Sequence, residues 1–264
     1  MIEYCNVKLE GGHELFDADM SSDGNWIAVV GSEVADLAIS LGTEIRLPRC
    51  FRFPIVRLID HERFLVIDSR AKSECDLNAY LISVASPSRP INFHAGDGIA
   101  DVLVTTNYII CTYFDEGVFG DCPISAEGVS VFDFTGKFCF GYQSRLTCDA
   151  VDIADCYAAC NDNGDAIAFC AYTGFPIVHW NLKSGSHIAA QLPDELHGVS
   201  AMSAFQGDIF LYSPYKSRNV LFHYKNGHYR QIGTEEGRLK TLRDGRFLRR
   251  EPEGFSIIDC RNCV

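Results

Sequence analysis

Residues 129–142, Val-Ser-Val-Phe-Asp-Phe-Thr-Gly-Lys-Phe-Cys-Phe-Gly-Tyr, decide the fold class that the sequence predicts. Two short runs of aromatic and β-branched residues, Val129–Phe134 and Lys137–Tyr142, are separated only by Thr135-Gly136. Such runs are typical of half-buried strands, and a two-residue connection that contains glycine is typical of a tight hairpin. This stretch therefore predicts a pair of antiparallel strands.

Similar short strand-like runs, separated by turn residues, occur on both sides of this stretch. Runs such as Ile27–Val30, Phe64–Ile67 and Ala166–Tyr172 are short and rich in Val, Ile, Phe and Tyr, and 22 glycines and 9 prolines supply turns between them. Helical periodicity is confined to Val34–Leu41 and Asp149–Cys160, where the pattern is compatible with a short helical turn. We predict an all-β protein with about twenty strands.

This number of strands favours a β-propeller, in which each blade is a four-stranded sheet of about 40 residues. A chain of 264 residues accommodates six or seven blades, some of them irregular. Polar turns that pair Gly with Asp or Asn before an apolar strand recur at Asp23-Gly24, Asn163-Gly164, Gly207-Asp208 and Asp244-Gly245. A two-sheet sandwich or a pair of small barrels is the competing architecture. Because no Ser-, Pro- or Gly-rich linker divides the chain, we expect residues 1–264 to form a single β-propeller-like domain.

The charge is distributed unevenly. The chain carries 23 Lys and Arg against 35 Asp and Glu, a formal net charge of −12, and residues 97–165 hold 12 carboxylates with only Lys137 and Arg145 as cations. An acidic surface of this kind repels a phosphate backbone and accelerates encounter with a basic protein. We therefore expect a basic protein partner and no direct binding of nucleic acid.

The rest of the sequence limits the cellular compartment and the cofactors that we expect. No apolar run approaches the roughly 20 residues that span a bilayer, and Met1–Cys5 lacks the features of a secretion signal, so we expect a cytoplasmic protein with no membrane partner. In that compartment the 12 cysteines stay reduced. The pairs Cys156/Cys160 and Cys260/Cys263 lack a second pair of zinc ligands, and no nucleotide-binding motif is present. We expect no metal and no cofactor.

Two motifs could carry chemistry. Asp115 and Glu116 stand between aromatic residues, and paired carboxylates at the hub of a propeller can hydrolyse glycosides. Neighbours in an extended segment face opposite sides, so a catalytic pair would need a distant partner such as Asp60, Asp155 or Glu195. The basic stretch Arg238–Arg250 is interpreted as an exposed edge hairpin, whose cations discourage aggregation.

A family resemblance rests on three sequence segments: Tyr113–Gly120, Glu127–Asp133 and Asp155–Cys160. Over roughly residues 100–180 the chain resembles small bacterial propeller-type proteins that serve as immunity partners of secreted antibacterial toxins. The resemblance implies a propeller-like fold, a cytoplasmic location and no catalytic residues.

Together, these observations predict a non-enzymatic immunity protein that binds a basic toxin domain, such as a nuclease, and neutralises it. A propeller glycoside hydrolase or lyase with central carboxylates, and a scaffold in a larger assembly, are the alternatives. The residues expected to contact the partner are acidic, with three aromatic anchors among them: Asp97, Asp101, Tyr113, Phe114, Asp115, Glu116, Phe119, Asp121, Glu127, Asp149, Asp152 and Asp155.

Overall fold

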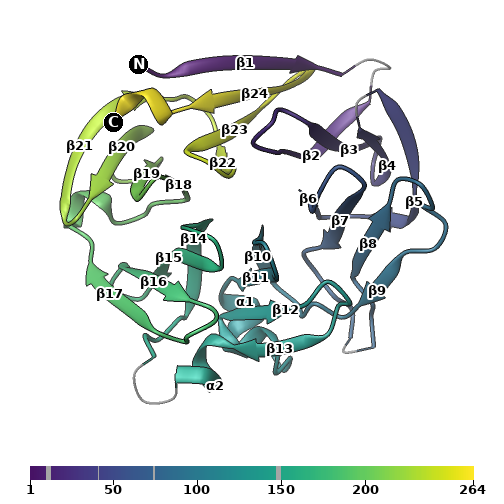
Figure 1. Ribbon diagram of the computed structural model, residues 1–264, viewed down its shortest axis with the longest axis horizontal. Helices are drawn as coiled ribbons and strands as arrows, with labels where there is room; N and C mark the ends of the chain where they lie inside the picture. Colours follow the sequence, from purple (N-terminus) through teal and green to yellow (C-terminus); the bar gives the residue numbers. More distant parts are fainter. Residues whose placement is uncertain (10–12, 41, 74, 147–149) are drawn as a thin grey trace.

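The computed structural model describes residues 1–9, 13–40, 42–73, 75–146 and 150–264. In these residues the chain forms 24 strands, grouped into six four-stranded sheets that follow one another around a ring (Figure 1). The prediction of an all-β propeller is confirmed, with six blades. Neither the sandwich nor the pair of barrels describes this ring.

Each of the first five blades uses four consecutive strands, from the innermost to the outermost. Blade 1 contains β2 (Glu14–Met20), β3 (Trp26–Gly31), β4 (Ala35–Ser40) and β5 (Thr43–Phe51), and blade 2 contains β6 (Pro54–Leu58), β7 (Arg63–Asp68), β8 (Ala79–Ser83) and β9 (Ile91–Phe93). Blade 3 contains β10 (Ile99–Val104), β11 (Ile109–Tyr113), β12 (Val129–Phe132) and β13 (Phe138–Gly141). Blade 4 contains β14 (Asp155–Asn161), β15 (Ala166–Tyr172), β16 (Pro176–Asn181) and β17 (His187–Gln191), and blade 5 contains β18 (Ala201–Phe205), β19 (Asp208–Ser213), β20 (Val220–Lys225) and β21 (His228–Thr234).

Blade 6 closes the ring by joining the two ends of the chain. Its inner strands are β22 (Leu239–Thr241), β23 (Arg246–Glu251) and β24 (Gly254–Asp259), and its outermost strand is β1 (Glu3–Lys8). β1 pairs antiparallel with β24 along its whole length, from Glu3 opposite Asp259 to Lys8 opposite Gly254. Because the chain continues from β1 into blade 1, this pairing within blade 6 ties the first and sixth blades together; Figure 1 shows β1 beside β24 at the top of the ring.

The hairpin predicted at residues 129–142 is present as β12 and β13, with Val131 opposite Phe140. Gly136 takes a φ of +81° at its turn, a conformation that glycine adopts without steric cost. Side chains from such strands fill the space between blades. The ring of Tyr142, at the end of blade 3, lies 5.1 Å from those of Phe169 and Trp180 in blade 4.

The two predicted helical turns are wrong, because residues 35–40 form β4 and residues 155–160 lie in β14, and both strands contain a β-bulge; Leu41 and Asp149 lie outside the described residues. In β4 the register shifts between Ala35 and Leu37, so that Ala35, Ala38 and Ile39 are the buried residues, a spacing that imitates one helical face. A similar shift interrupts β14 between Cys156 and Ala158. A bulge adds one residue to a strand and so breaks the period of two that identifies it in a sequence.

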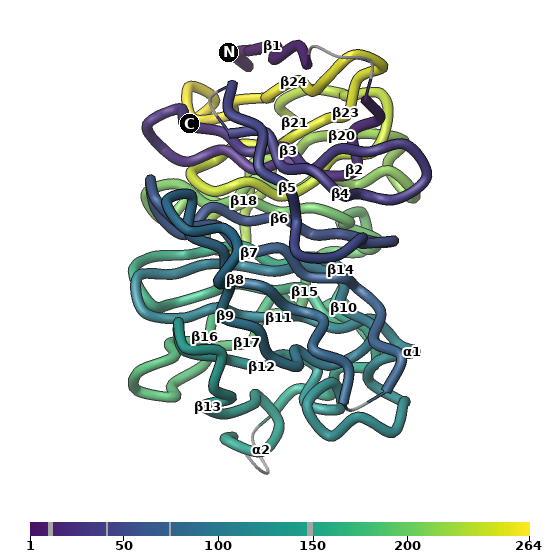
Figure 2. Tube along the Cα trace, turned by 90° about the vertical axis from the view of Figure 1, so that its right-hand side faces the viewer, coloured from purple at the N-terminus to yellow at the C-terminus, as the bar shows by residue number. Residues whose placement is uncertain are grey.

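Helices are short and lie in the connections. α1 (Asp115–Val118) and a 3₁₀ turn at Ser125–Glu127 occupy the link between β11 and β12, and α2 (Tyr142–Leu146) follows β13. Further 3₁₀ turns lie at Asp194–Leu196 and Arg261–Cys263. Seen from the side, α1 lies on one face of the ring (Figure 2). No helix in the described residues is long and apolar enough to cross a membrane.

Candidate functional site

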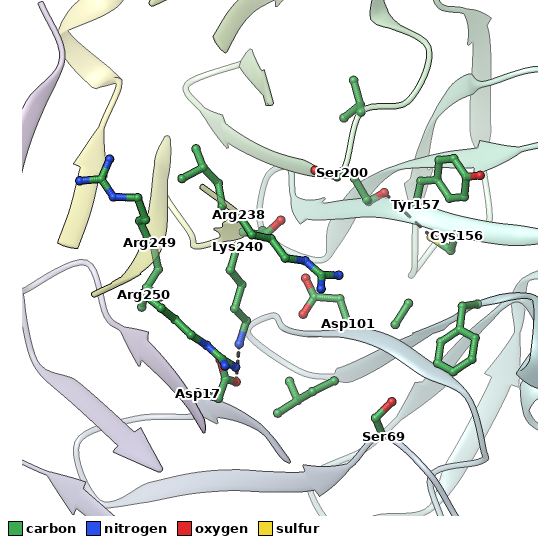
Figure 3. Close-up of a pocket in the computed structure, with 18 of the residues that line it drawn as sticks. Asp17, Ser69, Asp101, Cys156, Tyr157, Ser200, Arg238, Lys240, Arg249 and Arg250 are labelled. Carbon is green, nitrogen blue, oxygen red and sulfur yellow. Dashed lines mark hydrogen bonds and ion pairs between the residues drawn. The ribbon is translucent and has the colours of Figure 1, made fainter. Parts of the chain in front are cut away.

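A cavity of about 1750 Å³ lies at the centre of the ring, where the six innermost strands begin. Each blade contributes to its wall, for example through Asp17 of β2, Asp101 of β10 and Lys240 of β22. The connection that carries α1 reaches the rim through Phe114. Figure 3 shows the polar side chains that converge on this cavity.

Three residues of the cavity wall, Asp17, Asp101 and Lys240, belong to a network of buried ions that also includes Arg57. The Arg57 guanidinium forms a salt bridge with Asp101 and lies 3.6 Å from Asp17 Oδ2, and Lys240 Nζ donates to the same Asp17 oxygen. Burial lowers the pKa of Lys240, as does the positive charge of Arg57, whereas Asp17 and Asp101 oppose this shift. Because opposite charges surround each member, these four groups stabilise one another inside the ring.

The same network ties neighbouring blades together through the backbone. Arg57 donates to the carbonyl oxygen of Val102 at 2.6 Å, and the backbone N–H of Val56 donates to Asp17 Oδ2 at 2.7 Å. Blade 2 is therefore linked to blade 3 on one side and to blade 1 on the other. A structural role for these ions follows directly from their contacts.

Other cations at the cavity have no such partner. Among the described residues, no carboxylate oxygen lies within 4.0 Å of the side-chain nitrogens of Arg52, Lys216, Arg238 or Arg250. Figure 3 shows Arg238 and Arg250 extending from the β22–β23 side into the cavity, whereas Arg249 points away. Arg249 is neutralised by Glu235 at 2.8 Å and Glu251 at 2.9 Å.

The interpretation of Arg238–Arg250 as an edge hairpin is therefore right for β22 but wrong about where that edge lies. β22 is an edge strand, but it is the innermost strand of its blade and faces the central cavity. Residue alternation cannot distinguish an edge that faces solvent from an edge that faces a channel. Only the closure of the ring makes this distinction.

Asp155 lies across the cavity, at the start of β14. Partial burial raises its pKa to about 6, and the negative charge of Asp115 in α1 adds to this effect. A carboxyl group with such a pKa can both give and accept a proton near neutral pH. The structure thus places Asp155, one of the distant partners that the sequence suggested, close to Asp115.

Aromatic rings form the wall beside Asp155. The ring centroids of Tyr157 and Tyr172 are 5.8 Å apart in a stacked arrangement, and Phe175 stacks on His197 at 4.7 Å. Tyr157, Phe175 and His197 all line the cavity. This side of the cavity therefore offers flat apolar surface, opposite the side that offers positive charge.

The residues predicted to bind a partner do not form a single patch. Asp97 and Glu116 both pair with Arg70, while Asp101 belongs to the buried ions. Glu127 accepts a hydrogen bond at 2.8 Å from the backbone N–H of Ser144 in α2.

The other predicted partner residues divide between the interior and the surface. Tyr113 is fully buried and donates to the Ala95 carbonyl oxygen at 2.6 Å, so it cannot anchor a partner. Asp115 and Glu116 belong to α1, so the extended segment that the sequence predicted for them is wrong. Asp149 lies outside the described residues. Asp115, Phe119, Asp121 and Asp152 are exposed, and Phe114 lies at the rim of the cavity.

Arg57 was not singled out from the sequence, and Lys240, Arg238 and Arg250 were assigned to an edge hairpin and not to a site. The excess of cations near the end of an otherwise acidic chain was the available signal, but their common location depends on the ring. No group of three or more His, Cys, Asp and Glu side chains is placed to hold a metal ion in the parts of the chain that the structure describes.

No family model and no curated protein matches this sequence. Solved structures share the fold. A catalytically inactive variant of virginiamycin B lyase from Staphylococcus aureus, with quinupristin, has 12% identity and a TM-score of 0.58 over 98% of this chain and 99% of that chain. PorZ of the Porphyromonas gingivalis type-IX secretion system has 10% identity and a TM-score of 0.58 over 96% of this chain and 34% of its own. Kluyveromyces lactis Hsv2 has 10% identity and a TM-score of 0.53 over 89% and 71%. At these identities the likeness establishes the fold alone.

Proposed function

We propose that this protein is a non-enzymatic binding module that docks a basic protein on the face of the ring that carries α1. The observation that carries the proposal is Phe119, which is 74% exposed in a loop that also contains the exposed carboxylates Asp115 and Asp121. Aromatic anchors provide much of the binding energy at protein interfaces, and surrounding charges select a partner of opposite sign. A partner with an apolar pocket bordered by Lys and Arg matches this arrangement.

The loop that presents Phe119 is held against its neighbours. The backbone N–H of Phe114 donates to the Gly98 carbonyl oxygen, and that of Phe119 to the Asp115 carbonyl oxygen, both at 2.9 Å. Gly117 packs so closely that an added Cβ would lie 2.3 Å from the carbonyl oxygen of Asp97. A loop that is already ordered loses little entropy when it binds, which favours affinity.

The finer proposal is that the partner is a basic toxin domain, such as a nuclease, and that this protein is its cytoplasmic immunity protein. Two features support it: the net charge of −12 and the resemblance of residues 100–180 to immunity proteins. A nuclease presents Lys and Arg to phosphates, and the acidic loop would occupy the same cations. Neutralisation then results from steric and electrostatic blocking of the toxin's surface.

The test places a photo-crosslinking amino acid at position 119 and isolates the crosslinked protein from the native cell. A double reversal, Asp115→Lys with Asp121→Lys, changes the charge of the loop. Glu44→Lys is the matched control, because Glu44 is an exposed carboxylate on the outermost strand of blade 1. We expect one basic protein to be captured, to be lost in the double reversal and to be retained in the control.

The outcomes test docking through the acidic loop and neutralisation of a toxin separately. Capture of a basic protein that survives the double reversal would contradict docking through the acidic loop. A loop-dependent partner without toxic activity would support docking but overturn the neutralising role. If the captured protein is toxic, its activity must fall when the purified chain is added in equal amount.

A second function is favoured by Asp155, whose pKa of about 6 suits acid–base catalysis beside a large cavity. Here the chain is a hydrolase or lyase that acts on an anionic saccharide. Asp155 exchanges the proton, Arg238 and Arg250 hold the anionic group, and the aromatic wall receives the sugar rings. Lyases are among the solved structures that share this fold.

The discriminating assay incubates the protein with oligogalacturonates and with their neutral methyl esters. A lyase creates a carbon–carbon double bond that absorbs in the ultraviolet, whereas a hydrolase releases a reducing end without it. Turnover that disappears in Asp155→Asn and persists in Asp152→Asn would establish the enzyme. No turnover of either substrate by the wild-type protein would remove this candidate.

A further inference from the structure

A histidine that follows blade 2 and a cysteine of blade 3, 28 residues apart in sequence, come into contact. His94, which follows β9, places its Nε2 atom 3.4 Å from the Sγ atom of Cys122, in the connection between β11 and β12. Both side chains are partly exposed. No spacing in the sequence indicates this pair, because two separate connections bring it together.

The other ring nitrogen of His94 determines what faces the sulfur. His94 Nδ1 lies 2.9 Å from the carbonyl oxygen of Asp76. A carbonyl oxygen only accepts hydrogen bonds, so Nδ1 carries the proton and donates it, and Nε2 of the neutral ring is free to accept the thiol proton. Thiol, base and orienting acceptor are therefore aligned, which is the arrangement of an activated nucleophile.

The surroundings of the sulfur favour its ionised form. Partial burial acts to raise the pKa of Cys122, but hydrogen bonds from the backbone N–H groups of Ser125 and Ile124, together with the His94 ring and the Ser125 hydroxyl, lower it overall.

Few other charges face this pair. The Asp76 carboxylate is neutralised by Arg49 at 3.0 Å, and the Tyr113 phenol donates to the Ala95 carbonyl oxygen. Buried thiols elsewhere behave differently. Desolvation raises the pKa of Cys170 to about 12, and it also raises the pKa of Cys111. Cys122 therefore combines an ionisable sulfur with partial access from solvent.

We propose that Cys122 is a reactive thiol that exchanges with low-molecular-weight disulfides, with His94 as the base that activates it. His94 takes the thiol proton, and the thiolate attacks one sulfur of the disulfide. The sulfur–sulfur bond of the reagent breaks, a new bond joins Cys122 to one half, and the other half leaves as a thiolate that takes the proton back from His94. Cys122 is oxidised and the leaving sulfur is reduced, so no other reactant is required. Partial burial admits a small disulfide more readily than a protein.

The experiment uses the reduced full-length protein and 4,4′-dithiodipyridine, a small neutral disulfide. The reaction is quenched with acid at a series of times, and each cysteine is followed by peptide mass spectrometry under non-reducing conditions. Cys5, Cys50 and Cys139 are exposed and serve as internal comparators. Below the pKa of a thiol, each unit by which that pKa falls raises the exchange rate about threefold, because the gain in thiolate outweighs the loss of nucleophilicity.

We expect Cys122 to react at least about threefold faster than the exposed comparators at pH 6.5, despite its lower exposure. Its rate should also rise less steeply than theirs between pH 6 and pH 8. His94→Asn should reduce the rate at Cys122 to that of the comparators or below. His61→Asn, at a side chain that is 73% exposed and contacts Asp23 and Asn25, should leave it unchanged.

Two results would overturn the proposal. One is a wild-type rate at Cys122 no greater than the rates at Cys5, Cys50 and Cys139. The other is an unchanged rate in a folded His94→Asn protein. If that variant does not fold, the wild-type comparison and its pH profile decide the matter alone. The measurement follows a covalent bond at one residue, so its result is independent of what docks near Phe119.

Discussion

Replacing Asp155 with asparagine should stabilise the protein at neutral pH and not at acidic pH. The pKa of Asp155 rises from the model-compound value of 3.8 to about 6 in the folded protein. Between these values the folded state binds more protons than the unfolded state, so the free energy of unfolding decreases as pH rises through this window. Asparagine resembles the protonated carboxyl group and does not titrate.

The magnitude follows from the size of the shift. A shift of roughly two pH units corresponds to about 3 kcal/mol at about 1.4 kcal/mol per unit. Because Asp155 is only half-buried, screening by solvent reduces the expected gain to about 1–2 kcal/mol at pH 7.5. At pH 4 the wild-type carboxyl group is largely protonated in both states, and the two proteins should differ by only a few tenths of a kcal/mol.

Urea unfolding at pH 4, 6 and 7.5, followed by tryptophan fluorescence, measures this difference. The protein concentration is kept low because the sequence pI is about 5.0. Asp115→Asn is the companion variant: it removes one cause of the shift and should stabilise the protein at pH 7.5 by a smaller amount. A gain in the free energy of unfolding that is equal at all three pH values, or a loss of stability at pH 7.5, would refute the assignment of a raised pKa to Asp155.

Three further predictions concern the ring itself. Asp17→Ala leaves two buried cations without their shared carboxylate and should cost about 3–5 kcal/mol in urea unfolding, whereas Glu44→Ala on an exposed strand should cost less than about 0.5. Gly117→Ala forces a Cβ to within 2.3 Å of the Asp97 carbonyl oxygen and should cost about 1–3 kcal/mol, measured by the same assay. Removal of residues 1–8 exposes the edge of β24 and should lower the thermal midpoint and produce oligomers in size-exclusion chromatography; a monomer of unchanged thermal stability would contradict closure by β1.

The strands could be predicted because their signal is local. Val129–Phe132 and Phe138–Gly141 alternate and are bounded by a glycine turn, and the structure contains both strands. The prediction failed where a contact with the neighbouring strand alters the local period. Ala35–Ser40 looks helical only because its bulge displaces one residue against β3 and β5.

The candidate site could be predicted only in part. Asp155 and Asp115 were both named from the sequence, yet nothing in the chain between them shows that β14 lies beside α1. Tyr113 has the composition of an anchor, but it ends a strand that is buried along its whole length. Aromatic residues suit cores and interfaces equally well, so composition alone cannot assign them.

The sequence by itself determined that this protein is built from short strands joined by glycine-rich turns, that it is acidic, and that its cations gather near its end. These properties depend on residue type and on neighbours within a few positions. The tertiary structure alone decided that β22 faces a cavity, that Asp17 neutralises Arg57 and Lys240, and that His94 reaches Cys122. Each of these contacts joins segments from different strands or connections, and the closing of the ring sets their distances.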